Sequence, residues 1–255
     1  MQRSEAIDAI RMSISNAEQP LPLPSEFERF WCSSDNKIQF QKFFIAWLVE
    51  YHHDQKPVYL GGCHQNAIDK CFVLQNGTLI EKPSLEYSCD EADDRIIFHL
   101  NNAVQTDGYT FAHAVFSDTD IMVNIVYHHI KWKTYGLREI WMLQSGTVTP
   151  LHEIHDSLPK EAISILPAIH ALTGCDTTAK VGTKLQAFSA SKKAEHFQLR
   201  DFGVNPLDQD MVSSAECFLL DCMSKIVKRT VDSFDTLRYE ARQQQSTSFL
   251  VPPLL

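Results

Sequence analysis

Strands and helices are expected to alternate through the middle of the chain, and this alternation constrains the fold more than any other feature of the sequence. Apolar side chains recur at helical spacing in some segments and form short continuous runs in others. The expected order is a helix at 91–105, a strand at 110–116, a helix at 118–129 and a strand at 137–143. Alternation at this length predicts βαβ units and an α/β fold with a mostly parallel sheet. We expect helices on both faces of that sheet, and we expect the strand at 57–60 to join it.

The two ends of the chain differ from this middle. Residues 1–25 are mostly polar and end in the proline-rich stretch Pro20–Pro24, which predicts a stiff, extended linker. Residues 26–178 are expected to form the α/β core, and residues 179–255 a helical C-terminal region.

Two local patterns make sharper predictions in the first half. Aromatic residues recur at three- and four-residue spacing between Phe27 and Leu48, which predicts a helix with an aromatic stripe facing the core. Asn76-Gly77 lies between apolar runs within 71–81, a combination that predicts a β-hairpin.

Composition limits the classes of function. Apolar residues make up 44% and charged residues 22%, as in an ordinary globular protein. No apolar run approaches the roughly 20 residues needed to span a bilayer, and the polar start is not typical of a signal peptide. We therefore expect an intracellular protein, in the nucleus or the cytoplasm, with no membrane partner. The formal net charge is −9, so binding of nucleic acid has to be local or metal-assisted.

The cysteines and histidines show no zinc-binding pattern. Seven cysteines without a CxxC motif indicate reduced, buried thiols and no disulfide framework. The pairs His128-His129 and His152/His155 lack a third and a fourth ligand at zinc spacing, so no zinc site is expected from the sequence.

Acidic residues gather at three points of the predicted core. Asp118 and Asp120 follow the strand at 110–116, where open α/β sheets place their ligands, and a helix N-cap needs only one acid. Asp176 follows a helix expected at 159–172 that Gly174 ends. A third group lies at the start of the helix at 91–105, where a solvated helix N-terminus would explain several of its members. They are Glu86, Asp90, Glu91, Asp93 and Asp94.

Three groups of acidic residues at one edge of a sheet predict hard oxygen ligands for Mg²⁺ or Mn²⁺. A pair of such ions activates a water and stabilises the leaving oxygen in phosphodiester hydrolysis. The carboxylates that form the site are then expected to lie within about 10 Å of one another, because two ions about 4 Å apart have to be bridged. Asp90 and Asp94 are expected to point away from it.

Three strings of residues resemble a family of uncharacterised, often multicopy animal proteins. They are SCDEADDRIIFH at 88–99, SDTDI at 117–121 and LPAIHALTGCDTT at 166–178, against the usual forms EADTRIILH, DTDVLVL and LPALHALTGCDTTS. That family is similar in turn to the PIN-like nucleases of the flap-endonuclease and XPG group. The resemblance runs from about Leu21 to about Arg238, and LTGCDTT is its most specific string. It implies a PIN-like, Rossmannoid fold and a Mg²⁺- or Mn²⁺-dependent endonuclease.

The resemblance also implies roles for individual residues. Glu91 and Asp93 would bind a first metal ion, and Asp118 and Asp120, with Asp176, a second. Asp118 and Asp120 would be the catalytic pair. The turn at 180–184 resembles one that grips a nucleic-acid backbone, through Lys180, Gly182 and Lys184. The surrounding segment is locally basic, although a solvated loop would have the same composition.

Departures from the family pattern leave the activity open. Two further aspartates, on strands that precede these motifs in the family, have no counterpart here, and we expect a copy truncated at both ends. If active, it would hydrolyse branched or single-stranded DNA or RNA, as a poor nuclease. The alternative is an inactive, mobile-element-derived relic with a binding role or none. A third possibility is a different α/β phosphohydrolase that uses Asp118 and Asp120. Missing edge strands would expose apolar sheet, so self-association is expected.

Overall fold

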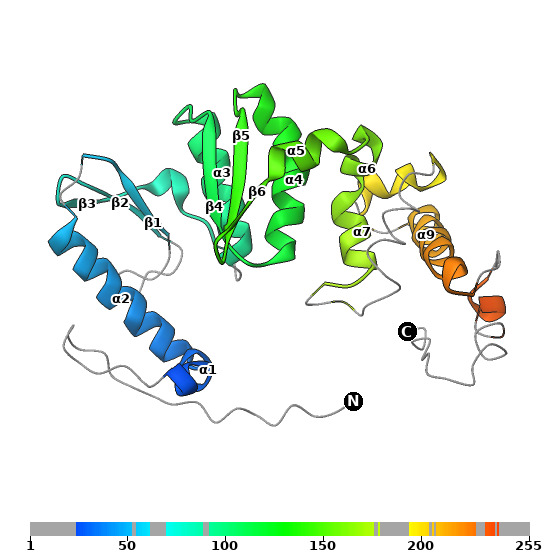
Figure 1. Ribbon diagram of the computed structural model, residues 1–255, viewed down its shortest axis with the longest axis horizontal. Coiled ribbons are helices and arrows are strands. Elements are labelled where there is room, and N and C mark those ends of the chain that lie inside the picture. The colour runs from blue at the N-terminus through cyan, green and yellow to red at the C-terminus, as the bar shows by residue number, and fades with distance from the viewer. Residues whose placement is uncertain are drawn as a thin grey trace. The chain divides into compact units, whose positions relative to one another are not determined.

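The structure is a computed structural model of mixed α/β type (Figure 1). It describes residues 24–52, 55–61, 70–88, 92–175, 178, 194–203, 206, 208–227, 233–237 and 239. The chain divides into two compact units, residues 1–99 and residues 100–255, and the boundary falls inside the segment 26–178. Within the described residues, no helix combines the length and the apolar character needed to cross a membrane.

The first unit contains an antiparallel three-stranded sheet. Strands β1 (Val58–Gly61), β2 (Cys71–Gln75) and β3 (Thr78–Glu81) lie in that order. The turn between β2 and β3 is Asn76-Gly77, with φ of 51° and 71°, so the predicted hairpin is confirmed. Both residues need positive φ in this type of turn, and Asn and Gly tolerate it best.

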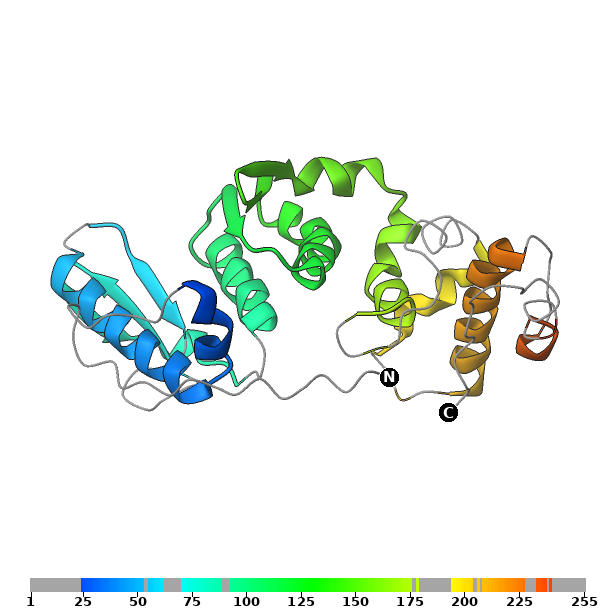
Figure 2. The ribbon, with the colours of Figure 1, turned by 60° about the horizontal axis from the view of Figure 1, so that its bottom comes forward.

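Helices α1 (Phe27–Trp31) and α2 (Ser34–Tyr51) precede this sheet, and α2 lies alongside it (Figures 1 and 2). Ser33 caps α2 by accepting a hydrogen bond from the Asn36 backbone N–H at 3.4 Å. The predicted helical structure is confirmed as two helices, and Phe30 of α1 is buried, but none of the aromatic side chains of α2 is fully buried. Phe44 is 44% exposed and Trp47 42% exposed, because the aromatic rings of α2 stack mainly on one another along its length.

Helix α3 (Ala92–Gln105) follows the sheet, and its first two turns contact β1. A Cβ atom at Gly61 would lie 2.8 Å from Arg95 Cδ and 2.9 Å from His99 Nε2. The glycine therefore lets strand and helix approach more closely than a side chain would permit. Arg95 Nη2 also donates to the Tyr87 carbonyl oxygen at 3.1 Å.

The second unit begins with the predicted βαβ arrangement. Strands β4 (Phe111–Val115) and β5 (Glu139–Gln144) are parallel, and helix α4 (Thr119–Thr134) connects them. Strand β6 (Thr147–Pro150) pairs antiparallel with β5.

The expectation of one mostly parallel sheet is wrong for the described strands. Strand β1 belongs to the sheet of the first unit, and three of the four strand pairings are antiparallel. The nine residues between β1 and β2 are fewer than a parallel crossover connection needs, which is a dozen or more.

Several short helices and one long helix follow β6 in the described part of the chain. They are α5 (Leu151–Ser157), α6 (Lys160–Ser164), α7 (Leu166–Leu172), the 3₁₀ helix η3 (Ala194–Asp201) and α9 (Gln209–Val227). The single helix expected at 159–172 is divided at Ile165, because Pro167 lies in the first turn of α7 and cannot continue a preceding helix. Within the described part of 179–255, η3 and α9 are helical, whereas much of that region lies outside the described residues.

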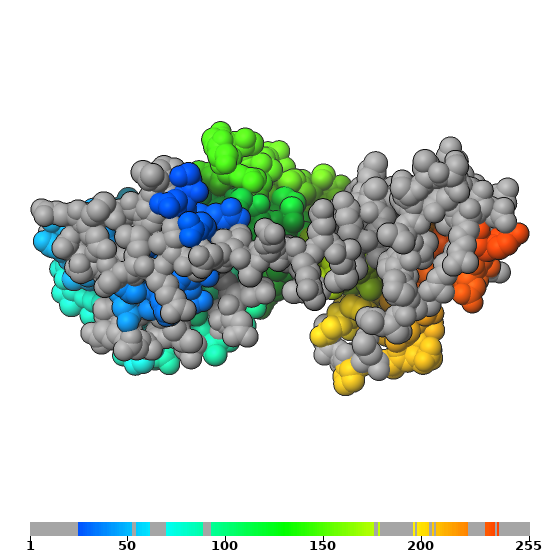
Figure 3. Space-filling view, turned by 90° about the horizontal axis from the view of Figure 1, so that it is seen from below, coloured from blue at the N-terminus to red at the C-terminus, as the bar shows by residue number. Residues whose placement is uncertain are grey.

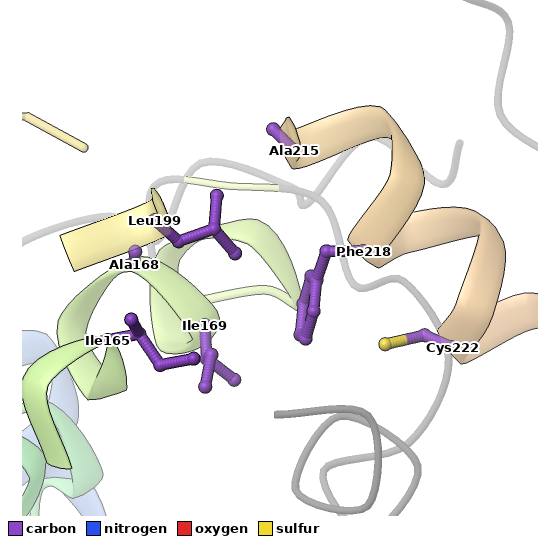
Figure 4. Close-up of a cluster of buried hydrophobic side chains, with 7 residues drawn as sticks. All are labelled: Ile165, Ala168, Ile169, Leu199, Ala215, Phe218 and Cys222. Atoms are coloured by element: carbon purple, nitrogen blue, oxygen red, sulfur yellow. The ribbon is translucent and has the colours of Figure 1, made fainter. Parts of the chain in front are cut away.

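The apolar core of this region joins α7, η3 and α9 (Figure 4). Phe218 of α9 points toward Ile169 of α7 and toward Ile165, which lies between α6 and α7, and each of the seven residues drawn is buried. The yellow η3 and the gold start of α9 lie side by side at the surface (Figure 3). His196 of η3 and Asp221 of α9 add a hydrogen bond of 2.7 Å between them.

Candidate functional site

The pair Asp118 and Asp120, here called the acidic corner, lies between β4 and α4. Asp118 is the N-cap of α4, and its Oδ1 accepts a hydrogen bond from the Asp120 backbone N–H at 2.9 Å. Because β4 and β5 are parallel, their carboxyl ends meet at the same edge of the sheet, and the corner follows the end of β4. This is the edge at which open α/β sheets bind ligands.

The N-cap role makes a prediction about stability. Asp118→Ala removes the acceptor for an orphan N–H of α4 and is expected to lower the free energy of unfolding by about 1 kcal/mol. Asp118→Asn keeps an acceptor oxygen at the same place and is expected to change it by only a few tenths of a kcal/mol. Urea unfolding followed by circular dichroism measures both. Equal losses in the two variants would contradict the cap assignment.

His170 of α7 holds the second carboxylate of the acidic corner. Its Nε2 lies 2.6 Å from Asp120 Oδ1, and the His170 and Asp120 side chains are 13% and 28% exposed. A carboxylate can only accept, so the imidazole Nε2 carries the hydrogen and donates it. This contact links α4 to α7 and fixes the orientation of Asp120.

The segment after α7 folds back on the end of that helix. Thr178 Oγ1 donates to the Ala171 carbonyl oxygen at 2.7 Å and accepts from the Cys175 backbone N–H at 3.0 Å. Gly174 has a φ of 105°, a backbone conformation that ends helices and that glycine adopts without strain. Ala171 is the neighbour of His170, so both anchor points of this turn lie close in sequence to the residue that contacts Asp120.

Of the other predicted site residues, only Asp93 lies in the described part of the chain. Asp93 is half-buried in the first turn of α3 and belongs to the first unit, whereas the acidic corner belongs to the second. Asp94, beside it, is exposed. The remaining predicted residues lie outside the described part of the chain, so the convergence of five acids stays a prediction. They are Glu91, Asp176, Lys180, Gly182 and Lys184.

The acidic corner fits a divalent cation only in part. Carboxylate oxygens suit Mg²⁺ and Mn²⁺, but Oδ1 of Asp118 and Oδ1 of Asp120 already accept hydrogen bonds. Each residue would therefore offer its second oxygen. Within the described ranges, no further His, Cys or carboxylate completes a three-ligand group at this corner.

A second group of polar side chains lies between α4 and α5. His129 of α4 is fully buried, and His155 of α5 is 7% exposed. Their ring centroids are 4.9 Å apart, at an interplanar angle of 78°. The side chain of Asp156 accepts hydrogen bonds at its Oδ1 from His155 Nδ1 at 2.9 Å and from Lys133 Nζ at 2.7 Å. We call His129, His155 and Asp156 the histidine cluster.

The environment of the histidine cluster perturbs two of its pKa values. Burial, with smaller contributions from His155 and Lys133, lowers the pKa of His129 to about 4. The hydrogen bond from Lys133, and then the one from His155, lowers the pKa of Asp156 to about 2. The cluster therefore presents a neutral His129 and an ionised Asp156 near neutral pH.

Comparison of the chain with protein-family models, with curated proteins and with solved structures finds no significant match. The resemblance to PIN-like nucleases therefore stays an expectation. Asp118 and Asp120 were predicted from the sequence, whereas His170 was not, although it lies within the LPAIHALTGCDTT string.

Proposed function

We propose that the acidic corner belongs to a cation-dependent phosphodiesterase site of the PIN-like nuclease type, which acts on nucleic acid. One observation supports the proposal above the others. The hydrogen bond between Asp120 and His170 joins the 117–121 string to the 166–178 string, two of the three strings on which the resemblance rests. Segments 50 residues apart thus meet at the acidic corner.

The side chains at the corner have separate tasks in this proposal. Asp118 and Asp120 are the catalytic pair and present carboxylate oxygens toward a divalent cation, while His170 is a positioning residue that holds Asp120. A bound Mg²⁺ or Mn²⁺ would supply charge neutralisation at the phosphate and a more acidic water. Glu91, Asp93 and Asp176 would complete the ligand set that the resemblance implies, which would hold two ions.

Recognition of the substrate has to be local in this protein, because its net charge is −9. We assign contact with the sugar-phosphate backbone to the basic segment that contains Lys180, Gly182 and Lys184. Backbone contacts of this kind bind without sequence preference and weaken with salt. Branched or single-stranded DNA or RNA is the substrate class.

A second candidate function is a non-catalytic domain. It is favoured by the internal hydrogen bonds of the acidic corner: Asp118 caps α4, and Asp120 accepts from His170. Both acids therefore have structural roles that need no cation. In this case the domain retains binding to nucleic acid or protein without hydrolysis.

Cleavage assays on the full chain distinguish the two candidates. End-labelled flap DNA, single-stranded DNA and single-stranded RNA are incubated with Mg²⁺, with Mn²⁺ or with EDTA. We expect metal-dependent cleavage that falls at least about a hundredfold in the double variant Asp118→Asn, Asp120→Asn, the scale of losing a charge-stabilising group. Asp210→Asn, which changes an exposed aspartate in the first turn of α9, serves as the matched control and is expected to cleave normally.

Two results would overturn the proposal. Cleavage that persists in the double variant would show that the activity does not come from the acidic corner. An inactive wild type whose Mn²⁺ binding, measured by electron paramagnetic resonance, is the same as that of the double variant would favour the non-catalytic domain.

A further inference from the structure

The histidine cluster contains buried nitrogen atoms that lack hydrogen-bond partners. Both ring nitrogens of His129, and Nε2 of His155, are buried without a partner within the described residues. Burial of a polar atom without a hydrogen-bond partner is unfavourable, because the atom loses its hydrogen bonds to water and gains none. Such atoms are rare in folded proteins. Three of them at one point between α4 and α5 call for a specific explanation.

The hydrogen bonds of Asp156 settle which nitrogen of His155 has a lone pair. Asp156 is an ionised acceptor, so the hydrogen of the His155 ring lies on Nδ1, which contacts Asp156 Oδ1 at 2.9 Å. His155 Nε2 therefore has a lone pair, and it is the buried, unpartnered atom. The contact between His155 Nδ1 and Asp156 Oδ1 is also the place where a metal ion can replace the ring hydrogen, because a metal-binding imidazole is neutral and coordinates through a nitrogen lone pair. The ring hydrogen then moves to His155 Nε2.

We propose that His129, His155 and Asp156 bind one transition-metal ion of the Zn²⁺ type, at a site separate from the acidic corner. One potential ligand atom from each residue lies within 4.8 Å of the others. Tetrahedral Zn²⁺ with ligands at roughly 2.0–2.1 Å requires ligand atoms about 3.3 Å apart, so small side-chain rotations close the site.

The donor set determines the class of metal. Two imidazoles and one carboxylate favour Zn²⁺ and its neighbours in the first transition row over Mg²⁺ or Ca²⁺, which prefer oxygen ligands only. Three protein ligands leave a fourth position for a water molecule or a substrate atom. Lys133 donates to Asp156 Oδ1, which leaves Asp156 Oδ2 to face the ion.

Metal titration of the full chain, stripped with a chelator, tests the proposal. We expect calorimetry to show one Zn²⁺ bound per chain, and Co²⁺ to develop the visible absorption of a four-coordinate site. His155→Gln, His129→Gln and Asp156→Asn are each expected to weaken Zn²⁺ binding at least about tenfold, since loss of an outer-shell partner alone costs that much. His113→Gln changes an exposed histidine on β4 and is expected to bind Zn²⁺ like the wild type.

A second measurement does not depend on buried variants that fold poorly. Long-range ¹H–¹⁵N spectra of the imidazoles, recorded on the wild type before and after one equivalent of Zn²⁺, are expected to show shifts at His129 and His155. Absence of Zn²⁺ binding by the folded wild type would overturn the proposal, as would shifts confined to other histidines. The double variant Asp118→Asn, Asp120→Asn is expected to keep its Zn²⁺ affinity, and a parallel loss would place the ion at the acidic corner instead.

Discussion

Replacing Phe218 with alanine is expected to lower the free energy of unfolding of the second unit by about 3–5 kcal/mol. Phe218 is fully buried in the cluster that joins α7, η3 and α9, and its ring fills the space between α9 and Ile169 (Figure 4). Truncation removes the transfer free energy of the ring and leaves a cavity that these helices can only partly close.

Urea unfolding of the full chain, followed by circular dichroism, measures the loss. Hydrogen exchange of peptides from α7 and α9 assigns it to the second unit, because a protein with two units need not unfold in one step. Val212→Ala is the matched control: Val212 is on the same helix but is 36% exposed, so we expect less than about 1 kcal/mol. A Phe218→Ala loss no larger than this control would mean that the three helices do not share a core.

Local signals in the sequence predicted local structure well. Asn76-Gly77 specified its hairpin because few other residue pairs adopt two consecutive positive φ angles without strain. The strand–helix–strand order from 110 to 143 was also predictable, since the helix between the two strands is long enough for a parallel crossover.

Partners of short strands were harder to predict. Strand β1 has only four residues, and an apolar run of that length contains no information about which strand it pairs with. It pairs with the hairpin that follows it, as consecutive strands commonly do. The spacing between β1 and β2 could have indicated this antiparallel pairing.

The same difference between local and long-range signals applies to the two candidate sites. The acidic corner was predictable because two acids, within a span of three residues, come soon after one strand, which is a purely local pattern. The histidine cluster was not, because His129 and His155 are 26 residues apart and meet only when α4 packs against α5. A search for zinc spacing in the sequence cannot detect ligands that tertiary packing brings together.

Acidification of the metal-free protein is expected to destabilise the second unit through His129. Its pKa is about 4 in the folded chain and 6.5 without the protein environment. Between these values the unfolded chain binds the proton and the folded chain does not, so stability falls as the pH falls. The contribution is complete above pH 6.5 and is lost by pH 4, and a difference of 2.5 pKa units corresponds to about 3 kcal/mol.

The groups that face His129 determine how readily it is protonated. His155, His152 and Lys133 oppose its protonation, and Asp156, which favours it, stays ionised throughout this range because its own pKa is about 2. Urea unfolding in EDTA at several pH values between 7 and 4 is expected to show a much weaker pH dependence for His129→Gln than for the wild type. His113→Gln should keep the wild-type dependence, since that histidine is exposed. Equal slopes in wild type and His129→Gln would mean that the buried imidazole accepts its proton without opening the contact between α4 and α5.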